Sequence, residues 1–272
     1  MPQAFTPMRI PLSVDGTALE ISAIHRGGDQ APIVFLHGFG STKEDYADIV
    51  RHPAFAGHPF VAFDAPGCGE TRCADLSKVS ITFQVKSALA VVDQLGFERF
   101  HLIGHSMGAL ASLMLAHAHP ARVLSFVNIK GNLAPEDCFL SRQIFDHPQD
   151  DIERFFDDFI ERTRLSPTYS SALYAASLRH KVQLGAVSGI FRSMVELSDS
   201  GDLLDKFLGL PFPKMFMYGE QYASLSYLPQ IQAHGVTLAE IEHCGHFPMY
   251  SNPQKMWERI AWLHQQCSPG ER

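Results

Sequence analysis

Short, nearly continuous apolar runs alternate along most of the chain with amphipathic stretches of helical period. Four such runs are typical of strands buried on both faces of a parallel sheet: Pro32–Leu36, Phe60–Phe63, Phe100–Ile103 and Leu124–Ile129. Between the second and the third run, Ser80–Leu95 places its apolar side chains on one side, and Gly96 is suited to end a helix there. This alternation predicts an α/β fold with helices packed on both faces of the sheet.

Strands are also predicted near both ends of the chain. Met8–Val14 and Ala18–His25 flank the dipeptide Asp15-Gly16, which favours a tight hairpin turn, so we expect an antiparallel start. Towards the other end, the pattern predicts two further strands and a terminal helix: Pro213–Tyr218, Val236–Ile241 and Pro253–Gln265.

Residues 131–210 contain no convincing strand. Asp150–Arg162 carries apolar side chains at the i, i+3, i+4, i+7 and i+8 positions of a helix, and further helices are predicted at Ser171–Leu184 and Ala186–Leu197. We therefore predict a core domain formed by residues 1–130 and 211–272, interrupted by a helical cap of residues 131–210.

Composition and charge narrow the class of protein. The 272 residues are 46% hydrophobic, enough for one large core with an insertion. A net charge of −7 without a Lys/Arg cluster argues against nucleic-acid or membrane partners. No apolar stretch approaches the roughly 20 residues that span a bilayer, and Met1–Pro11 lacks the layout of a secretion signal. The five cysteines contain no C-x-x-C pair, so neither a disulfide framework nor a zinc site is indicated. We expect a cytoplasmic monomer or homodimer that acts on a small molecule without a metal or organic cofactor.

One motif carries a specific chemistry. Gly104–Gly108 reads GHSMG, a G-x-S-x-G pattern between the predicted strand Phe100–Ile103 and the helix-forming run Ala109–His117. In this strand-turn-helix setting the glycines allow a sharp turn with the serine at its apex. A serine hydroxyl is a poor nucleophile unless a base takes its proton and donors receive the oxyanion formed on attack. Ser106 is therefore the candidate nucleophile.

Candidate partners for this serine follow two other predicted strands. His246, in the segment HCGHFP after the last strand, is the candidate base, because the carboxyl ends of parallel strands share one edge of the sheet. His243, in the same segment, is the fallback. The segment His37–Gly40, which reads HGFG, follows the first parallel strand. Its Phe39 N–H, together with the N–H of Met107, is the candidate oxyanion hole.

Together these motifs resemble capped serine hydrolases of the α/β-hydrolase fold. HGFG, the segment DAPGCGET that begins at Asp64, GHSMG and the late GHFP occur in the order and spacing of that family, from about residue 33 to 262. The resemblance implies an eight-stranded, mostly parallel sheet with a helical cap after the sixth strand, and a nucleophile-acid-histidine triad. Ser106 resembles its nucleophile, His246 its base, and Phe39 with Met107 its oxyanion donors. Asp64 is predicted to hold its own loop through hydrogen bonds to the backbone.

The triad acid is where this chain departs from the family. Tyr222 occupies the common position of the acid, and Lys130 occupies the alternative position after the sixth strand. Three possibilities stay open: Glu220 reaches His246 from a neighbouring position, Asp137 or Glu136 folds back over the site, or no acid exists. An acid fixes the imidazole tautomer and stabilises the imidazolium, so its loss is costly without abolishing the chemistry.

A serine nucleophile makes an acyl-enzyme intermediate natural. The expected function is therefore hydrolysis of a carboxylic ester with a small or medium apolar acyl group. C–C bond hydrolysis and perhydrolysis on the same fold stay open, as does a non-catalytic or weakly active relative that lacks the acid. Aromatic side chains of the predicted cap, among them Phe156, Phe159 and Phe191, suit either an apolar acyl pocket or packing of the cap onto the core.

Overall fold

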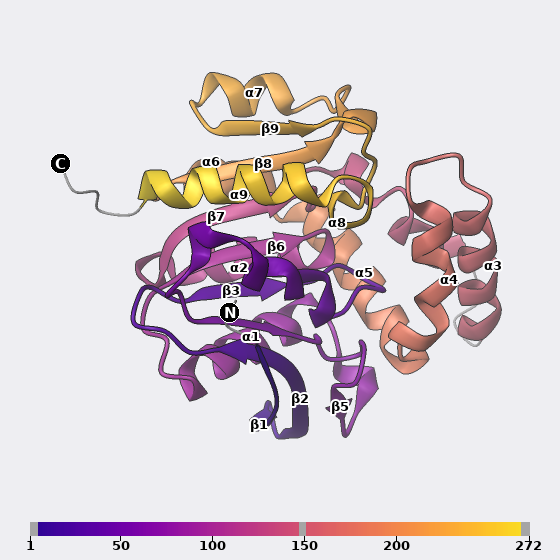
Figure 1. The fold of residues 1–272 in the computed structure, drawn as a ribbon. Coiled ribbons are helices and arrows are strands. Elements are labelled where there is room, and N and C mark those ends of the chain that lie inside the picture. Colours follow the sequence, from indigo (N-terminus) through magenta and orange to yellow (C-terminus); the bar gives the residue numbers. More distant parts are fainter. Residues whose placement is uncertain (1–4, 147–150, 268–272) are drawn as a thin grey trace.

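A nine-stranded, mostly parallel sheet forms the centre of the protein, which a computed structural model describes over residues 5–146 and 151–267. Six of its strands run parallel in the spatial order β4-β3-β6-β7-β8-β9 (Figure 1). Their bounds, in the same order, are Phe60–Phe63, Ile33–Leu36, Phe100–His105, Val123–Ile129, Lys214–Gly219 and Thr237–Ile241. Each of the first four overlaps an apolar run of the sequence, because a strand covered on both faces needs apolar side chains on both.

The antiparallel start is confirmed. β1 (Thr6–Val14) and β2 (Thr17–Arg26) pair across Asp15 and Gly16, both of which have positive φ, and β2 continues antiparallel onto β4. The path from β1 to β9 thus has the eight strands that the family resemblance implies. The ninth strand, β5 (Arg72–Cys73), pairs with β2 beside this path and is too short to leave a period in the sequence.

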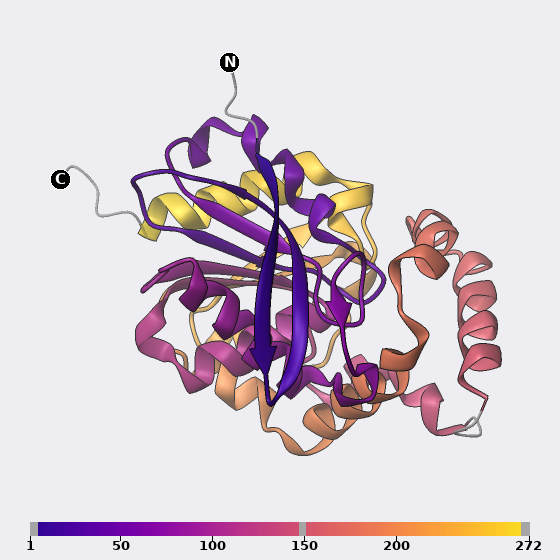
Figure 2. The ribbon, with the colours of Figure 1, turned by 90° about the horizontal axis from the view of Figure 1, so that it is seen from below.

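Helices cover both faces of the sheet, as the alternation predicts. Figure 2 shows the sheet between α9 (Pro253–Cys267) on one face and α1 (Ile81–Gln94) with α2 (Met107–Ala118) on the other. The 3-10 helix η1 (Lys43–Arg51) packs near β3 and β4, and α7 (Leu228–Ala233) lies beside β9. α1 begins after Ser80, whose hydroxyl accepts a hydrogen bond from the Phe83 N–H at 3.2 Å.

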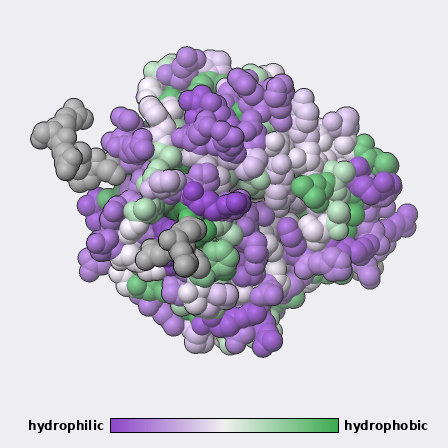
Figure 3. Space-filling view, in the orientation of Figure 1, coloured by the Kyte–Doolittle hydropathy of each residue, from purple (hydrophilic) through white to green (hydrophobic). Residues whose placement is uncertain are grey.

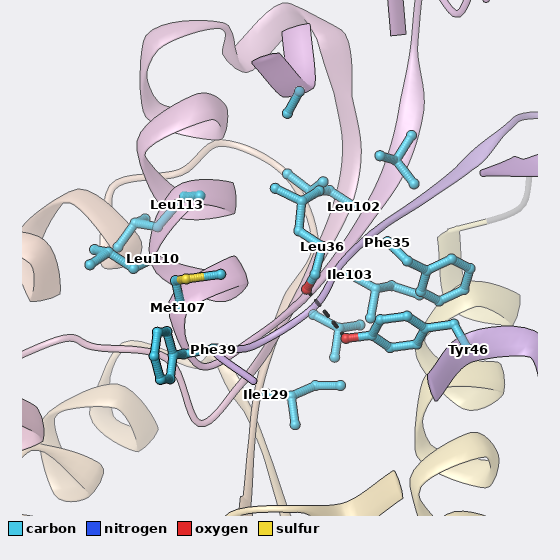
Figure 4. Close-up of a cluster of buried hydrophobic side chains, with 14 of the residues drawn as sticks. Phe35, Leu36, Phe39, Tyr46, Leu102, Ile103, Met107, Leu110, Leu113 and Ile129 are labelled. Carbon is cyan, nitrogen blue, oxygen red and sulfur yellow. Dashed lines mark hydrogen bonds between the residues drawn. The ribbon is translucent and has the colours of Figure 1, made fainter. Parts of the chain in front are cut away.

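Aromatic packing fixes the end of β3. Phe35 of β3 stacks on Tyr46 of η1 with ring centroids 4.5 Å apart. The Tyr46 hydroxyl donates to the carbonyl of Leu36 at 3.3 Å, the dashed line in Figure 4. All three side chains are buried, so the strand end that precedes the HGFG segment is fixed from below.

Between β7 and β8 the chain forms a group of helices, here called the helical insertion (residues 131–210). In its described parts, residues 131–146 and 151–210, it contains two 3-10 helices and four α-helices: η5 (Pro135–Cys138), η6 (Ser141–Asp146), α3 (Ile152–Arg164), α4 (Ser171–Lys181), α5 (Leu184–Ser200) and α6 (Leu203–Leu208). The three longest correspond to the predicted helices, although Asp150, the first residue predicted for α3, lies outside the described residues. α3 turns Phe155, Phe156 and Phe159 inward, which is the face that the sequence spacing indicates.

Apolar side chains on the surface gather in the helical insertion. In the face shown in Figure 3, apolar atoms appear on the side where α3 and α4 lie and also toward the centre and the opposite side, among otherwise hydrophilic atoms. The exposed large apolar residues of the described ranges are Phe139, Leu140, Phe145, Leu165, Tyr169, Leu173 and Trp262, and all but the last belong to the insertion. None of the helices in the described ranges has the length and apolar character needed to cross a membrane.

Candidate active site

Ser106 lies at the apex of a strained turn between β6 and α2. Its φ of 51° and ψ of −120° are unusual for a residue with a side chain, and strain of this kind concentrates at functional sites. The flanking glycines make room for the turn: a Cβ on Gly108 would lie 2.3 Å from the carbonyl oxygen of Leu36, and one on Gly104 would lie 2.6 Å from the Ala109 Cα. The Ser106 N–H donates to the carbonyl of Ile129 at 2.9 Å, which fixes the apex against β7.

The structure brings His246 to this serine. His246 follows β9 and lies just before α8 (Pro248–Ser251), and its Nε2 is 2.8 Å from the Ser106 hydroxyl oxygen. The segment that carries it is held by His105, whose Nε2–H donates to the carbonyl of His246 at 2.7 Å. That bond fixes the tautomer of His105 and leaves its Nδ1 a buried acceptor without a hydrogen-bond donor among the described residues. The GHSMG motif therefore supplies both the serine and a support for the histidine, a role for His105 that sequence reasoning missed.

The HGFG segment runs directly beside the serine. A Cβ on Gly38 would lie 3.1 Å from the Ser106 Cβ. His37 holds this segment: its Nδ1–H donates to the carbonyl of Gly38 at 2.7 Å, and its Nε2 accepts from the Ala65 N–H at 2.9 Å. The Gly38–Phe39 peptide, which carries the Phe39 N–H, is thus fixed next to Ser106. Met107 is the first residue of α2, where N–H groups have no carbonyl one turn earlier within the helix to accept from them.

Asp64 is structural, as predicted. Its buried carboxylate accepts hydrogen bonds from the N–H of Lys43 and of Glu70, each at 2.9 Å, and pairs with the Lys43 ammonium at 2.9 Å. These bonds tie the loop after β4 to the start of η1. A buried carboxylate needs such partners, because an unpaired charge in the interior is costly.

Lys130 and Tyr222 occupy the two positions at which the family resemblance places the triad acid. Lys130, directly after β7, is buried with φ of 45°, and its Nζ lies 2.5 Å from a carboxylate oxygen of Asp137. The same ammonium lies 4.8 Å from the ring centroid of Tyr222. The Tyr222 ring in turn meets the His246 ring edge to face, with centroids 5.9 Å apart. Both positions therefore adjoin the candidate base without offering it a carboxylate.

The remaining candidate acids have other partners. The carboxylate of Glu220 lies 3.8 Å from Nδ1 of His243, and Glu136 accepts hydrogen bonds from the N–H and hydroxyl of Ser226. Within the described residues, no carboxylate forms a hydrogen bond with His246. The structure thus brings together Ser106 and His246 but leaves Glu220 in contact with the fallback histidine, and the acid role of Glu220 stays a prediction.

Asp137 is likewise engaged elsewhere. Besides Lys130, it accepts from the Tyr227 hydroxyl at 3.0 Å and from the N–H groups of Leu133 and Ala134 at 2.8 and 3.0 Å. These bonds use both carboxylate oxygens to hold the start of the helical insertion against β7. The contacts assign Asp137 a structural part, with Lys130 as its counter-charge.

The environment of the site favours a neutral imidazole. Burial lowers the pKa of His246 well below its ordinary value, and the nearby His105 and Lys130 lower it further. Burial also lowers the pKa of His105 to about 4. A neutral His246 can accept the Ser106 proton at pH 7, although the imidazolium that forms has no carboxylate partner in the described contacts. Nowhere in the described ranges do three or more His, Cys, Asp or Glu side chains have an arrangement that could hold a metal ion.

Known proteins share the fold and parts of the sequence. A family model described as the alpha/beta hydrolase family matches residues 33–259. A 2-hydroxy-6-oxononadienedioate/2-hydroxy-6-oxononatrienedioate hydrolase of Paraburkholderia phymatum is 29% identical over 141 residues, covering 51% of this chain and 49% of that protein. The monoacylglycerol lipase abhd6-A of Xenopus laevis is 24% identical over 255 residues, covering 84% of this chain and 73% of that protein.

A solved structure extends the likeness to the whole fold. A structure from work on carboxylesterases of Nitrososphaera gargenis has a TM-score of 0.74 at 14% identity, covering 95% of this chain and 99% of that one. The sequence matches are shorter, since the chain spans between about a quarter and a half of the length of several curated relatives.

Proposed function

Because the chain belongs to the alpha/beta hydrolase family, we propose that it is a serine hydrolase that cleaves a carboxylic ester through an acyl-enzyme. One observation carries the proposal: the Ser106 hydroxyl, at a strained apex, lies 2.8 Å from Nε2 of His246. A serine held in hydrogen-bond contact with a neutral imidazole has the base that its nucleophilicity requires. The core of residues 1–130 and 211–272 would carry this chemistry, and residues 131–210 would cap it.

The proposed reaction has two steps. Ser106 Oγ attacks the ester carbonyl while His246 Nε2 takes its proton, and the oxyanion receives hydrogen bonds from the N–H groups of Phe39 and Met107. The imidazolium then gives the proton to the departing alcohol, which leaves an acyl group on Ser106. A water molecule, deprotonated by the same imidazole, releases the acid and restores the serine. The amino terminus of α2 adds its partial positive charge at the oxyanion.

Aromatic packing around Phe39 supports an apolar acyl group. The Phe39 ring contacts Phe191 with centroids 4.6 Å apart, and Phe156 and Phe159 at 6.3 and 6.1 Å. All four side chains are buried, so the surroundings of the proposed oxyanion loop are apolar on the side of the helical insertion. A small or medium acyl chain fits this environment better than a charged one, because a charge there would lose its hydration.

The contacts of the acidic residues support a Ser106–His246 pair that works without a carboxylate. For Glu220 to act as the acid, its side chain must leave His243 and reach Nδ1 of His246. Without an acid, the tautomer of His246 is set by its hydrogen bond to Ser106 and by the packing of its segment. Such a pair is a weaker catalyst than a complete triad, because nothing offsets the charge of the imidazolium.

A fluorophosphonate probe tests the proposal directly, because it reacts only with an activated serine. We expect stoichiometric labelling at pH 7 to 8 that is lost in Ser106→Ala and strongly slowed in His246→Ala. Ser200→Ala is the matched control: that hydroxyl is exposed, donates only to the Glu196 carbonyl and should label like the wild type. Absence of labelling in folded wild-type protein across pH 6 to 9 would reject the serine hydrolase assignment.

C–C bond hydrolysis is the second candidate, favoured by the similarity to the Paraburkholderia phymatum hydrolase. The name of that relative describes a substrate with a 2-hydroxy-6-oxo dienoate unit, an enol form of a vinylogous diketone. Purified protein should therefore be assayed in parallel on p-nitrophenyl butyrate and on a synthetic 2-hydroxy-6-oxo-dienoate, by absorbance. A kcat/KM at least ten times higher on the dienoate would replace the ester assignment, and the reverse ratio would retain it.

A further inference from the structure

We propose that Tyr174, in α4 of the helical insertion, is a positioning residue for the oxyanion donor on the HGFG segment. The site is then complete only while the insertion rests on that segment. The inference deepens the proposed function and rests on it.

The first observation is a hydrogen bond from the insertion to the proposed oxyanion loop. The Tyr174 hydroxyl donates to the carbonyl of Phe39 at 2.7 Å, and the side chain is buried. The preceding carbonyl, of Gly38, is held by His37 from within the core. Two successive peptide planes of the loop are thus fixed by two side chains, one from each part of the protein. The N–H of Phe39 belongs to the first of these planes, which the Phe39 Cα joins to the second, so a shift of the plane that Tyr174 holds moves the donor through the backbone dihedrals of Phe39.

The second observation is direct contact between α4 and the loop. Gly40 has φ of 70°, and a Cβ there would lie 2.2 Å from a methyl carbon of Leu178 and 2.8 Å from the Tyr174 hydroxyl oxygen. The helix therefore packs on the backbone of the loop with no room for a side chain between them. The positive φ and the close approach of α4 both require a glycine at position 40, which is the second glycine of HGFG.

The third observation links the same tyrosine to the base. The Tyr174 ring stacks on Phe247 with centroids 4.3 Å apart and planes inclined by 28°. Phe247 directly follows His246, and its ring also meets that of His105 at 5.6 Å. One residue of the insertion therefore touches the loop proposed to hold the oxyanion and the segment that carries the proposed base.

The expected effect falls on the transition state. Removing an oxyanion donor outright costs about 10²- to 10³-fold in kcat, so loosening a donor that stays in place costs less, about 10-fold. The ground-state ester makes weaker use of the same N–H, because its carbonyl oxygen carries less charge. Tyr174→Phe, which keeps the ring and its stacking on Phe247, should therefore lower kcat about 10-fold with little change in KM.

The experiment compares Tyr174→Phe with Tyr46→Phe on p-nitrophenyl butyrate. Tyr46 is the matched control, because its buried hydroxyl also donates to a backbone carbonyl, that of Leu36, on the strand below the site (Figure 4). We expect Tyr46→Phe to keep at least half of the wild-type kcat, because its ring still stacks on Phe35 and β3 stays paired with β4 and β6. Binding of an alkyl trifluoromethyl ketone, which forms an oxyanion on Ser106, should weaken in Tyr174→Phe in proportion to kcat. Leu178→Ala provides a second arm: it keeps the hydroxyl but removes packing against Gly40, and should lower kcat by a smaller factor.

The outcomes separate this inference from the proposed function. A wild type that is labelled by fluorophosphonate and active, with Tyr174→Phe and Leu178→Ala at wild-type kcat and ketone affinity, overturns the inference alone. Equal losses of kcat in Tyr174→Phe and Tyr46→Phe also overturn it, because the effect then follows from the loss of any buried hydroxyl. A wild type that is neither labelled nor active overturns the proposed function and this inference with it.

Discussion

Buried histidines form one group where the parallel strands begin, here called the amino edge, and another where they end, here called the carboxyl edge. β6 contributes one histidine to each group. At the amino edge, His101 lies near His264 and His58, with the Nε2 atoms of His58 and His264 3.0 Å apart. At the carboxyl edge, His105 lies beside His246, with ring centroids 5.0 Å apart. Burial lowers the pKa of His101 to about 3 and of His264 to about 4, shifts of the same direction and cause as at the carboxyl edge.

The comparison shows that a lowered histidine pKa does not by itself mark an active site. At the amino edge the imidazoles form hydrogen bonds with one another, with the Ser125 hydroxyl and with the Ala31 carbonyl. Neither Ser125 nor Ala31 has a positive φ. The carboxyl edge combines its histidines with a serine of positive φ, a glycine segment beside that serine and the start of a helix. Loops and helix starts meet at the carboxyl ends of parallel strands, which is why chemistry concentrates there.

The largest expected effect separates the two groups by activity. His246→Ala should lower kcat on p-nitrophenyl butyrate by about 10⁴-fold, the loss typical of a general base that acts with a serine. His264→Gln, at the amino edge, should leave kcat within about twofold while lowering the melting temperature, because a buried polar contact is disturbed. Comparable kcat losses in both variants would erase the distinction between the edges.

The next test concerns the acid at the carboxyl edge. Glu220→Gln should change kcat by less than about twofold, because its carboxylate contacts His243 rather than His246. The matched variant His243→Gln should behave in the same way, which steady-state kinetics on p-nitrophenyl butyrate can measure for both. A loss of about 100-fold or more confined to Glu220→Gln would identify that residue as the triad acid.

Stability against pH sharpens the comparison at the amino edge. The folded-state pKa of His101 is lowered from 6.5 to about 3, so below pH 6.5 the unfolded chain binds a proton that the folded protein excludes. Stability should therefore fall as the pH drops from 6.5 towards 3, by about 1.4 kcal/mol per pH unit for this group. His101→Gln should show a shallower decline in urea unfolding measured between pH 7 and 4. A slope equal to that of the wild type would remove His101 as the cause.

The smallest expected effect concerns the charge beside the base. Burial is the main cause of the lowered His246 pKa, and Lys130 adds to it. Lys130→Met should therefore raise the midpoint of the acid limb of kcat/KM, by less than about one pH unit, because burial and His105 remain. Lys206→Met is the control, and its pH-rate profile should match that of the wild type. In the wild type the Lys206 ammonium donates to the carbonyl of Gly201, near the end of the helical insertion. A downward shift of this midpoint in Lys130→Met would contradict the inference that the Lys130 charge lowers the pKa of His246.

Local pattern was enough for most of the fold. β4 has the bounds of its apolar run, Phe60–Phe63, and α1, α3, α4, α5 and α9 overlap their predicted helices. The elements that escaped prediction are short, such as β5, α6 and α7, or 3-10, such as η1. A few residues leave no measurable period, so these elements depend on what packs against them. β6 extends past Ile103 to His105, since pairing with β7 rather than side-chain pattern ends the strand.

The sequence by itself determined the candidate nucleophile, the candidate base and the family, because glycines beside a serine and a histidine after a final strand have local signatures. Only the tertiary structure decided which neighbour each polar group has. It directs the His105 N–H to the carbonyl of His246 and the Tyr174 hydroxyl to that of Phe39. The physical reason is that a hydrogen-bond partner is chosen by distance and direction in three dimensions. Residues up to 141 positions apart in the chain carry no mark of that choice.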